Sequence, residues 1–148
     1  MVNRRVPMEF DISGGLRFGC GQNNPLGLKL NFRRDGGTVR AEFTPARFYQ
    51  GWLKILHGGV IASLLDEAMG WAVRFYELND ITARMEVYFR RPISVDGFLV
   101  VTGTAVRSNG KFVETEAKVS LPGGTLMAEG IATYVAVVRP DRRQKGKS

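Results

Sequence analysis

The sequence predicts an α+β domain in which an antiparallel β-sheet wraps around one long central α-helix. Two observations carry this prediction. Apolar residues recur every three or four positions between residues 61 and 76, which is the spacing of one face of a helix. The segments before and after that stretch alternate apolar and polar residues, which is typical of strands, and turn-forming residues separate them. Two strands, one helix and four further strands in this order favour a single sheet that covers one helix.

The first two strands are expected to form a hairpin between residues 28 and 43. The cluster Asp35-Gly36-Gly37 interrupts the alternation and is typical of a turn. Apolar side chains share one face on either side of that turn, namely Leu28, Leu30 and Phe32 before it and Val39, Ala41 and Phe43 after it.

The helix and the later strands are predicted from the same two periods. The apolar residues at helical spacing are Ile61, Leu64, Leu65, Ala68, Ala72 and Tyr76. Four strands are expected after the helix, at 82–90, 98–107, 112–121 and 125–138. The pair Asn109-Gly110 and the run 122–124 predict hairpin turns between them.

The length of 148 residues corresponds to one domain. We expect a lead-in at 1–17, the folded domain at 18–138 and a basic, solvated tail at 139–148. The tail carries +4 of the formal net charge of +7, so charge gives the rest of the chain little tendency to bind nucleic acid, and we expect no nucleic-acid partner.

Cysteine and histidine each occur once, as Cys20 and His57. A single cysteine excludes an intramolecular disulfide, and so few ligands of this kind predict no metal site. The N-terminus has no apolar run typical of a secretion signal, and no stretch approaches the ~20 apolar residues of a membrane span. We therefore expect a cytoplasmic protein that does not bind a membrane.

The most unusual pattern lies around the predicted start of the helix. Gly59, Ser63, Asp66 and Gly70 recur at helical spacing and form one narrow stripe, which predicts open space around the Asp66 carboxylate. The preceding His57-Gly58-Gly59 places unpaired N–H groups and the positive end of the helix dipole where a ligand can approach. These residues predict an oxyanion-binding helix start with an acid about two turns deeper. The spacing alone leaves open that the glycines form only a turn and that Asp66 and Glu67 are a solvated acidic pair.

The run from Tyr49 to Gly70 closely resembles the signature of PaaI-like hotdog thioesterases, in which His-Gly-Gly precedes an acidic residue on the central helix. The nine-residue interval from His57 to Asp66 matches that signature. Thr82, followed by Pro92 ten residues later, resembles the family's strand after the helix, and residues 18–28 resemble the N-terminal segment of one branch. The resemblance covers residues 18 to 138.

This resemblance implies a hotdog fold and hydrolysis of an acyl-CoA thioester to a free acid and CoA. Asp66 would be the catalytic carboxylate, acting as a general base or as a nucleophile, and the Gly58 amide would polarise the thioester carbonyl. His57 would orient the loop or the thioester. Gln50 is the candidate for the family's upstream amide, although Gly51 occupies the equivalent spacing. The Thr82 hydroxyl would come from the partner subunit of a homodimer or a tetramer.

No separate cofactor is expected, because coenzyme A is part of the substrate. Gly59 would let the ligand approach the helix backbone. The remaining residues expected to contact CoA are two arginines after the strand at 82–90 and the turn between the next two strands, namely Arg90, Arg91, Arg107, Ser108, Asn109, Gly110 and Lys111.

Three other functions were weighed. A non-catalytic acyl-CoA-binding protein of the same fold is the main alternative, although a pure binder has no need of Asp66. A hotdog dehydratase or hydratase would pair an acid with a histidine in another arrangement, which His57 before the helix does not fit. Nucleic-acid binding has only the charge in its favour.

Overall fold

The computed structural model describes residues 15–75 and 78–138. Its elements are β1 (Arg33–Asp35), β2 (Thr38–Phe43), the short 3-10 helix η2 (Arg47–Tyr49), α2 (Gly58–Arg74), β3 (Leu78–Phe89), β4 (Leu99–Ser108), β5 (Phe112–Ser120) and β6 (Leu126–Val138). The strands form one sheet in the order β1-β2-β4-β5-β6-β3, and every neighbouring pair is antiparallel.

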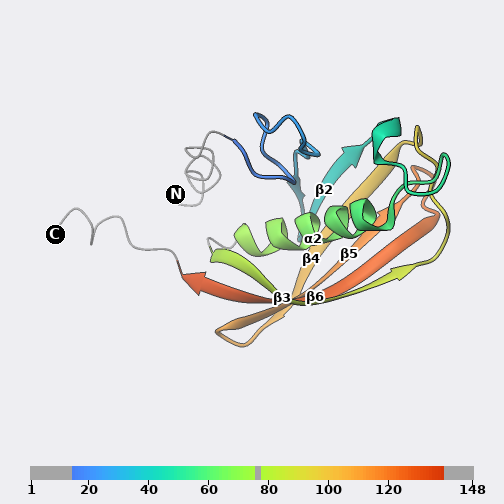
Figure 1. Ribbon diagram of the computed structural model, residues 1–148. Coiled ribbons are helices and arrows are strands. Elements are labelled where there is room, and N and C mark those ends of the chain that lie inside the picture. The colour runs from blue at the N-terminus through green and yellow to red at the C-terminus, as the bar shows by residue number, and fades with distance from the viewer. Residues whose placement is uncertain (1–14, 76–77, 139–148) are drawn as a thin grey trace.

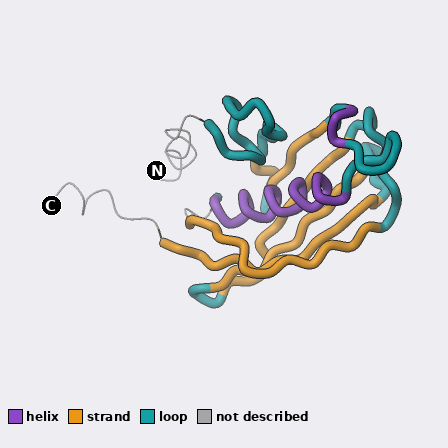
Figure 2. Tube along the Cα trace, viewed as in Figure 1, coloured by secondary structure: helices purple, strands orange, loops and turns teal. Residues whose placement is uncertain are grey.

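The sheet curves around α2, which lies along its concave face (Figure 1). The helix packs against β2, β3, β4, β5 and β6. Figure 2 shows the same arrangement, with the loops gathered at the end where the helix begins. The predicted fold class, one central helix wrapped by an antiparallel sheet, is confirmed.

The core lies between the helix and the inner face of the sheet. Strand β5 alternates strictly between exposed and buried residues, so that Val113, Thr115, Ala117 and Val119 face the helix. Near the centre of the sheet, Gly103 lets the helix approach closely, because a Cβ there would lie 2.6 Å from the backbone oxygen of Ala68. Any larger residue at that position would push the helix away from the sheet.

The N-terminal hairpin differs from its prediction in length. The turn at Gly36 and Gly37 is present, but β1 has only three residues and the stretch from Leu28 to Phe32 is not a strand. Lys29 adopts a positive φ of 56°, which interrupts extended backbone. The N–H of Leu28 donates to the carbonyl of Phe18. The N-terminal loop, residues 15–27, therefore holds this stretch in place, and its leucines remain buried.

The other elements lie close to their predicted positions. The helix begins at Gly58 and its last residue is Arg74, whereas Tyr76, the last residue of the predicted apolar series, lies outside the described residues. Strand β3 begins at Leu78, four residues before Thr82. The lead-in at 1–14 and the tail at 139–148 also lie outside the described residues. In the part of the chain that is described, no helix is both long and apolar enough to cross a membrane.

Candidate active site

The carboxylate of Asp66 accepts hydrogen bonds from two hydroxyl groups of the sheet. Thr82 Oγ1 lies 2.9 Å from Asp66 Oδ1. The hydroxyl of Tyr134 lies 2.5 Å from the same oxygen and 2.8 Å from the backbone carbonyl oxygen of Asp66. Among the described residues, no hydrogen bond reaches Oδ2. One oxygen of the carboxylate is therefore held and the other is left for a ligand.

Strand pairing explains why these three residues meet. Thr82 of β3 is the direct partner of Tyr134 of β6, so both side chains stand on the same face of the sheet. That face carries the helix, and Asp66 lies on the side of α2 that passes over this pair. A β-bulge follows between Thr82 and Arg84, an irregularity that reorients side chains and is frequent beside active sites.

Tyr134 is fully buried, with 0% of its surface exposed. Burial raises the pKa of its hydroxyl well above the ordinary value, and the negative charge of Asp66 raises it further. The phenol therefore stays protonated and remains a hydrogen-bond donor to the carboxylate.

The start of the helix is capped by His57. The Nδ1 atom of His57 accepts a hydrogen bond from the N–H of Gly59 at 2.7 Å, and the His57 carbonyl accepts from the N–H groups of Val60 and Ile61. The N–H of Gly58, the first residue of the helix, has no partner within the described residues. A single amide at the positive end of the helix dipole is thus free to bind a ligand oxygen.

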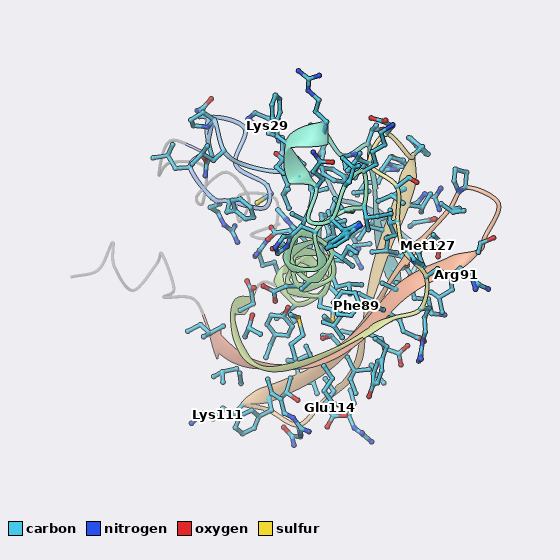
Figure 3. All side chains as sticks on the ribbon, turned by 45° about the vertical axis from the view of Figure 1, so that its right-hand side comes forward. Lys29, Phe89, Arg91, Lys111, Glu114 and Met127 are labelled. Carbon is cyan, nitrogen blue, oxygen red and sulfur yellow. The ribbon has the colours of Figure 1, made fainter. Side chains whose placement is uncertain are left out.

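The aromatic ring of Phe89 lies beside this free amide. A Cβ at Gly58 would lie 3.6 Å from ring atoms of Phe89, which is ordinary van der Waals contact. Phe89 is the last residue of β3 and is 56% exposed. Figure 3 shows its side chain near the end of the helix where the chain enters it. The free amide therefore has one apolar wall.

Gly58 and Asp66 of one chain lie too far apart to act on one carbonyl group. They are eight residues apart in α2, and eight residues of α-helix rise by about 12 Å. Reacting groups must approach to about 3–3.5 Å. The amide and the carboxylate of a single chain therefore cannot contact the same carbonyl group.

One detail of the predicted site is wrong, and another stays a prediction. Thr82 was expected to come from the partner subunit to the edge of the site; within this chain its hydroxyl contacts Asp66, and its place in a dimer stays a prediction. The stripe of small residues was expected to leave open space, but a Cβ at Gly70 would lie 2.7 Å from Asp80 Oδ2, so this end is filled. Ser63 donates to the carbonyl of Gly59 at 2.9 Å, which occupies its hydroxyl within the helix.

Gln50 makes a local contact in the loop before the helix. Its Oε1 accepts a hydrogen bond at 2.7 Å from the N–H of Lys54, which has a positive φ of 60°. Gly51 lies against His57, because a Cβ there would be 3.1 Å from the His57 Cα. The Gln50 carbonyl oxygen thus stabilises the loop that presents His57 and Gly58.

The residues expected to contact CoA lie at opposite ends of the sheet in one chain. The N–H groups of Arg90–Arg91 both donate to the carbonyl of Met127, near the start of β6. The turn at 107–111 lies beside the other end of β6, since Phe112 pairs with Val135. Eight residues of extended strand span about 26 Å. Only the arginine pair lies at the same end as the free Gly58 amide.

Most of these basic side chains already have partners. Arg90 Nη2 lies 2.8 Å from Glu129 Oε2 and Arg107 Nη2 lies 2.6 Å from Glu114 Oε1. Lys111 lies over the ring of Phe112. In Figure 3, Lys111 and Glu114 lie far from Arg91. Arg91 is exposed and lies at the end of the sheet where the helix begins. The turn residues Ser108, Asn109 and Gly110 are exposed as well.

The neighbouring acid, Glu67, lies on another side of the helix than Asp66, because successive residues of an α-helix are rotated by about 100°. It forms an ion pair with the buried Arg74 at 3.5 Å, and Arg74 also pairs with Asp80 at 2.7 Å. A Cβ at Gly19 would overlap the Glu67 carboxylate, so the N-terminal loop packs directly on it. Glu67 therefore has a structural role. Over residues 15–75 and 78–138, no cluster of three or more possible metal ligands is present.

Sequence reasoning missed Tyr134 as a partner of Asp66. The signal was available, because Ala128, Gly130, Ala132 and Tyr134 alternate along β6 and place the tyrosine on the core face, where its hydroxyl needs a partner. Phe89 was also missed, and no local pattern marks it. Its contact with Gly58 depends on how the end of β3 lies against the start of the helix.

Comparison with solved structures agrees with this architecture. A crystal structure of a thioesterase superfamily protein has a TM-score of 0.75 at 23% identity, covering 89% of this chain and 77% of that one. A hypothetical thioesterase from Streptococcus pneumoniae TIGR4, solved with coenzyme A, has a TM-score of 0.70 at 15% identity, covering 76% and 91%. A Streptococcus mutans UA159 protein bound to acetyl CoA has a TM-score of 0.70 at 14% identity, also covering 76% and 91%. No curated protein matches the sequence.

These likenesses define the class of protein by its fold, the hotdog fold of thioesterases. The family model described as Thioesterase superfamily matches residues 53–128, just over half of the 148 residues. The chain belongs to the thioesterase superfamily. The matched segment contains the helix start, Asp66 and Thr82.

Proposed function

We propose that this protein is an acyl-CoA thioesterase of the PaaI-like branch, which hydrolyses an acyl-CoA thioester to a free acid and CoA. The observation that carries the proposal is the unpaired N–H of Gly58 at the start of a helix that also bears Asp66. Membership of the thioesterase superfamily supports it. Two similar structures were solved with coenzyme A and with acetyl CoA, which supports the same ligand class here.

The proposed chemistry assigns different tasks to the start of the helix, at Gly58, and to its middle, at Asp66. The Gly58 amide donates to the thioester carbonyl oxygen and stabilises the negative charge that develops on it. Asp66, held through Oδ1, uses its free Oδ2 to remove a proton from an attacking water or to attack the carbonyl carbon itself. The first route gives the acid directly, and the second gives a mixed anhydride that water then cleaves. Both routes release CoA as a thiol.

The site is proposed to form between two copies of the chain. Because about 12 Å separates Gly58 from Asp66 along one helix, the carbonyl bound by Gly58 of one copy would be attacked by Asp66 of the other, together with that copy's Thr82. Strand β3 supports this arrangement, since it is twelve residues long and is an edge strand of the sheet that residues 15–75 and 78–138 form. Such an edge presents backbone groups that a second copy can pair with.

Further support comes from the Streptococcus pneumoniae thioesterase, of which aspartate-to-alanine and threonine-to-alanine mutants were crystallised. The two replaced positions are 16 residues apart in that protein, the same separation as Asp66 and Thr82. This agreement supports a functional role for the pair in the present chain.

Subunit mixing tests the proposed arrangement. Gly58→Pro removes the amide donor and Asp66→Asn removes the carboxylate, so each variant alone should be inactive. Refolding an equal mixture should restore roughly a quarter of wild-type thiol release, because half of the dimers are mixed and each of these has one intact site. If each site instead lay within a single chain, the mixture would recover no thiol release. Tight CoA binding without thiol release in the wild type would instead favour a non-catalytic acyl-CoA-binding protein.

A further inference from the structure

We infer that Tyr134 is a positioning residue for the reaction: its buried phenol holds one oxygen of Asp66, so that the other oxygen faces the thioester. This inference rests on the proposed function, since it concerns the same carboxylate. Nothing in the sequence motif or in the comparisons assigns a role to this tyrosine.

The geometry around Asp66 Oδ1 is the first support. Tyr134 and Thr82 both place a hydroxyl within hydrogen-bond distance of this one oxygen, at 2.5 Å and 2.9 Å. Two charge-assisted hydrogen bonds on one oxygen restrict rotation of the carboxylate about its side-chain bonds. Oδ2 then points in one direction instead of exchanging with Oδ1, which is the alignment that attack on a carbonyl requires.

The two donors differ in how firmly they are held. Thr82 is exposed and lies on the edge strand β3, next to a bulge. Tyr134 is fully buried in β6, with Thr82 paired on one side and Val113 on the other. Its hydroxyl also lies 2.8 Å from the Asp66 backbone carbonyl, so it contacts the helix backbone and the side chain together. Tyr134 is the donor whose position is fixed by rigid structure.

The chemical state of the phenol fits this role. Burial, with the Asp66 charge adding to it, raises the pKa of Tyr134 far above the working range of the protein. The hydroxyl therefore stays protonated and can donate to Asp66 Oδ1.

The test is Tyr134→Phe, which removes only the hydroxyl. We expect kcat for acyl-CoA hydrolysis to fall about tenfold to a hundredfold, with KM changed less than about twofold, as for loss of one hydrogen bond to a charged group. A tyrosine with a structural role alone would not separate kcat from KM in this way in a variant that remains folded.

Tyr49→Phe is the matched control. The hydroxyl of Tyr49 is partly buried and donates to the carbonyl of Gly27 at 3.2 Å, away from Asp66. This variant should keep the wild-type kcat and KM. Equal losses of kcat in the two variants, or a Tyr134→Phe enzyme with wild-type kcat, would overturn the inference.

A second measurement separates this inference from the proposed function. Carbon NMR at neutral pH observes the Asp66 carboxyl carbon without any substrate. Tyr134→Phe should change the chemical shift of that carbon, because the carboxylate loses a hydrogen bond, and Tyr49→Phe should leave it unchanged. An unchanged chemical shift in Tyr134→Phe would overturn the positioning role, whether or not the wild type hydrolyses a thioester. Absence of hydrolysis by the wild type, by contrast, would contradict the thioesterase proposal.

Discussion

Thr82 donates a hydrogen bond to the carboxylate of Asp66 within one chain, with 2.9 Å between the hydroxyl and Oδ1. The sheet and the helix thus supply one half of the proposed site from a single subunit, the acid with its donors. The free amide of Gly58 is the other half and lies about 12 Å away along the helix. In the proposed dimer each subunit would contribute to two sites, to one through Asp66 and to the other through Gly58.

Replacement of Gly58 by proline should remove the amide donor without disturbing the fold. Gly58 is the first residue of the helix, where proline is well tolerated, and its N–H has no partner to lose among the described residues. His57 has φ −62° and ψ 134°, a conformation that suits a residue before proline. Thiol release from an acyl-CoA should fall about a hundredfold or more, as for loss of an oxyanion donor.

Gly58→Ala is the control for that experiment, because it keeps the N–H and adds a methyl group at ordinary contact distance from Phe89. It should retain most of the activity. Equal activity in the proline and alanine variants would show that this amide does not take part in catalysis.

The fold could be predicted from the sequence because its apolar residues follow the helical spacing in one segment and the strand alternation in most of the others. Strand β5 alternates at every position, and the helix residues Leu64, Leu65 and Ala68 are fully buried as their spacing predicts. The stretch at 28–32 was misjudged, since its alternation reflects burial under a loop and Lys29 breaks the extended backbone. An alternating pattern indicates which side chains are buried. Whether the segment is a strand also depends on backbone hydrogen bonds to a neighbouring strand.

The candidate site could be predicted only where it is local in sequence. The cap at His57 and the amide of Gly58 follow from adjacent residues. The contact of Asp66 with Tyr134 joins residues 68 positions apart and depends on how α2 packs on β6. The contact of Thr82 with Asp66 could not be worked out from spacing for the same reason.

Arg74→Met should destabilise the protein strongly. Arg74 has 3% of its side chain exposed and neutralises Glu67 and Asp80, which are themselves mostly buried. Removing it leaves two carboxylates without their counter-charge, which costs about 3–5 kcal/mol for a buried pair. The free energy of unfolding from urea denaturation measures this loss.

Arg33→Met provides the comparison for that variant. Arg33 pairs with Glu42 at a similarly short 2.9 Å, but its side chain is 58% exposed. Because water screens an exposed ion pair, this change should have little effect on the free energy of unfolding. Similar losses in both variants would contradict the importance of burial in the Arg74 network.

Cys20 should react slowly in the folded protein. Burial raises the pKa of its thiol to about 11, and the nearby Glu67 carboxylate adds to the increase. Because the thiolate is the reactive form, alkylation by iodoacetamide at pH 8 should be about a hundredfold slower than in the urea-unfolded chain. Mass spectrometry of the alkylated fraction over time gives the two rates. Equal rates would show that the N-terminal loop does not cover this thiol.

The most direct test of the central claim is thiol release from a panel of acyl-CoA thioesters by the wild type, Asp66→Ala and Asp66→Asn. The account predicts turnover of at least one thioester by the wild type and a loss of at least about a hundredfold in both variants, as for removal of a positioned acid or base. Binding of CoA, measured by calorimetry, should be unchanged in Asp66→Asn. Equal rates of thiol release in the three proteins would contradict the assignment of Asp66 as the catalytic carboxylate.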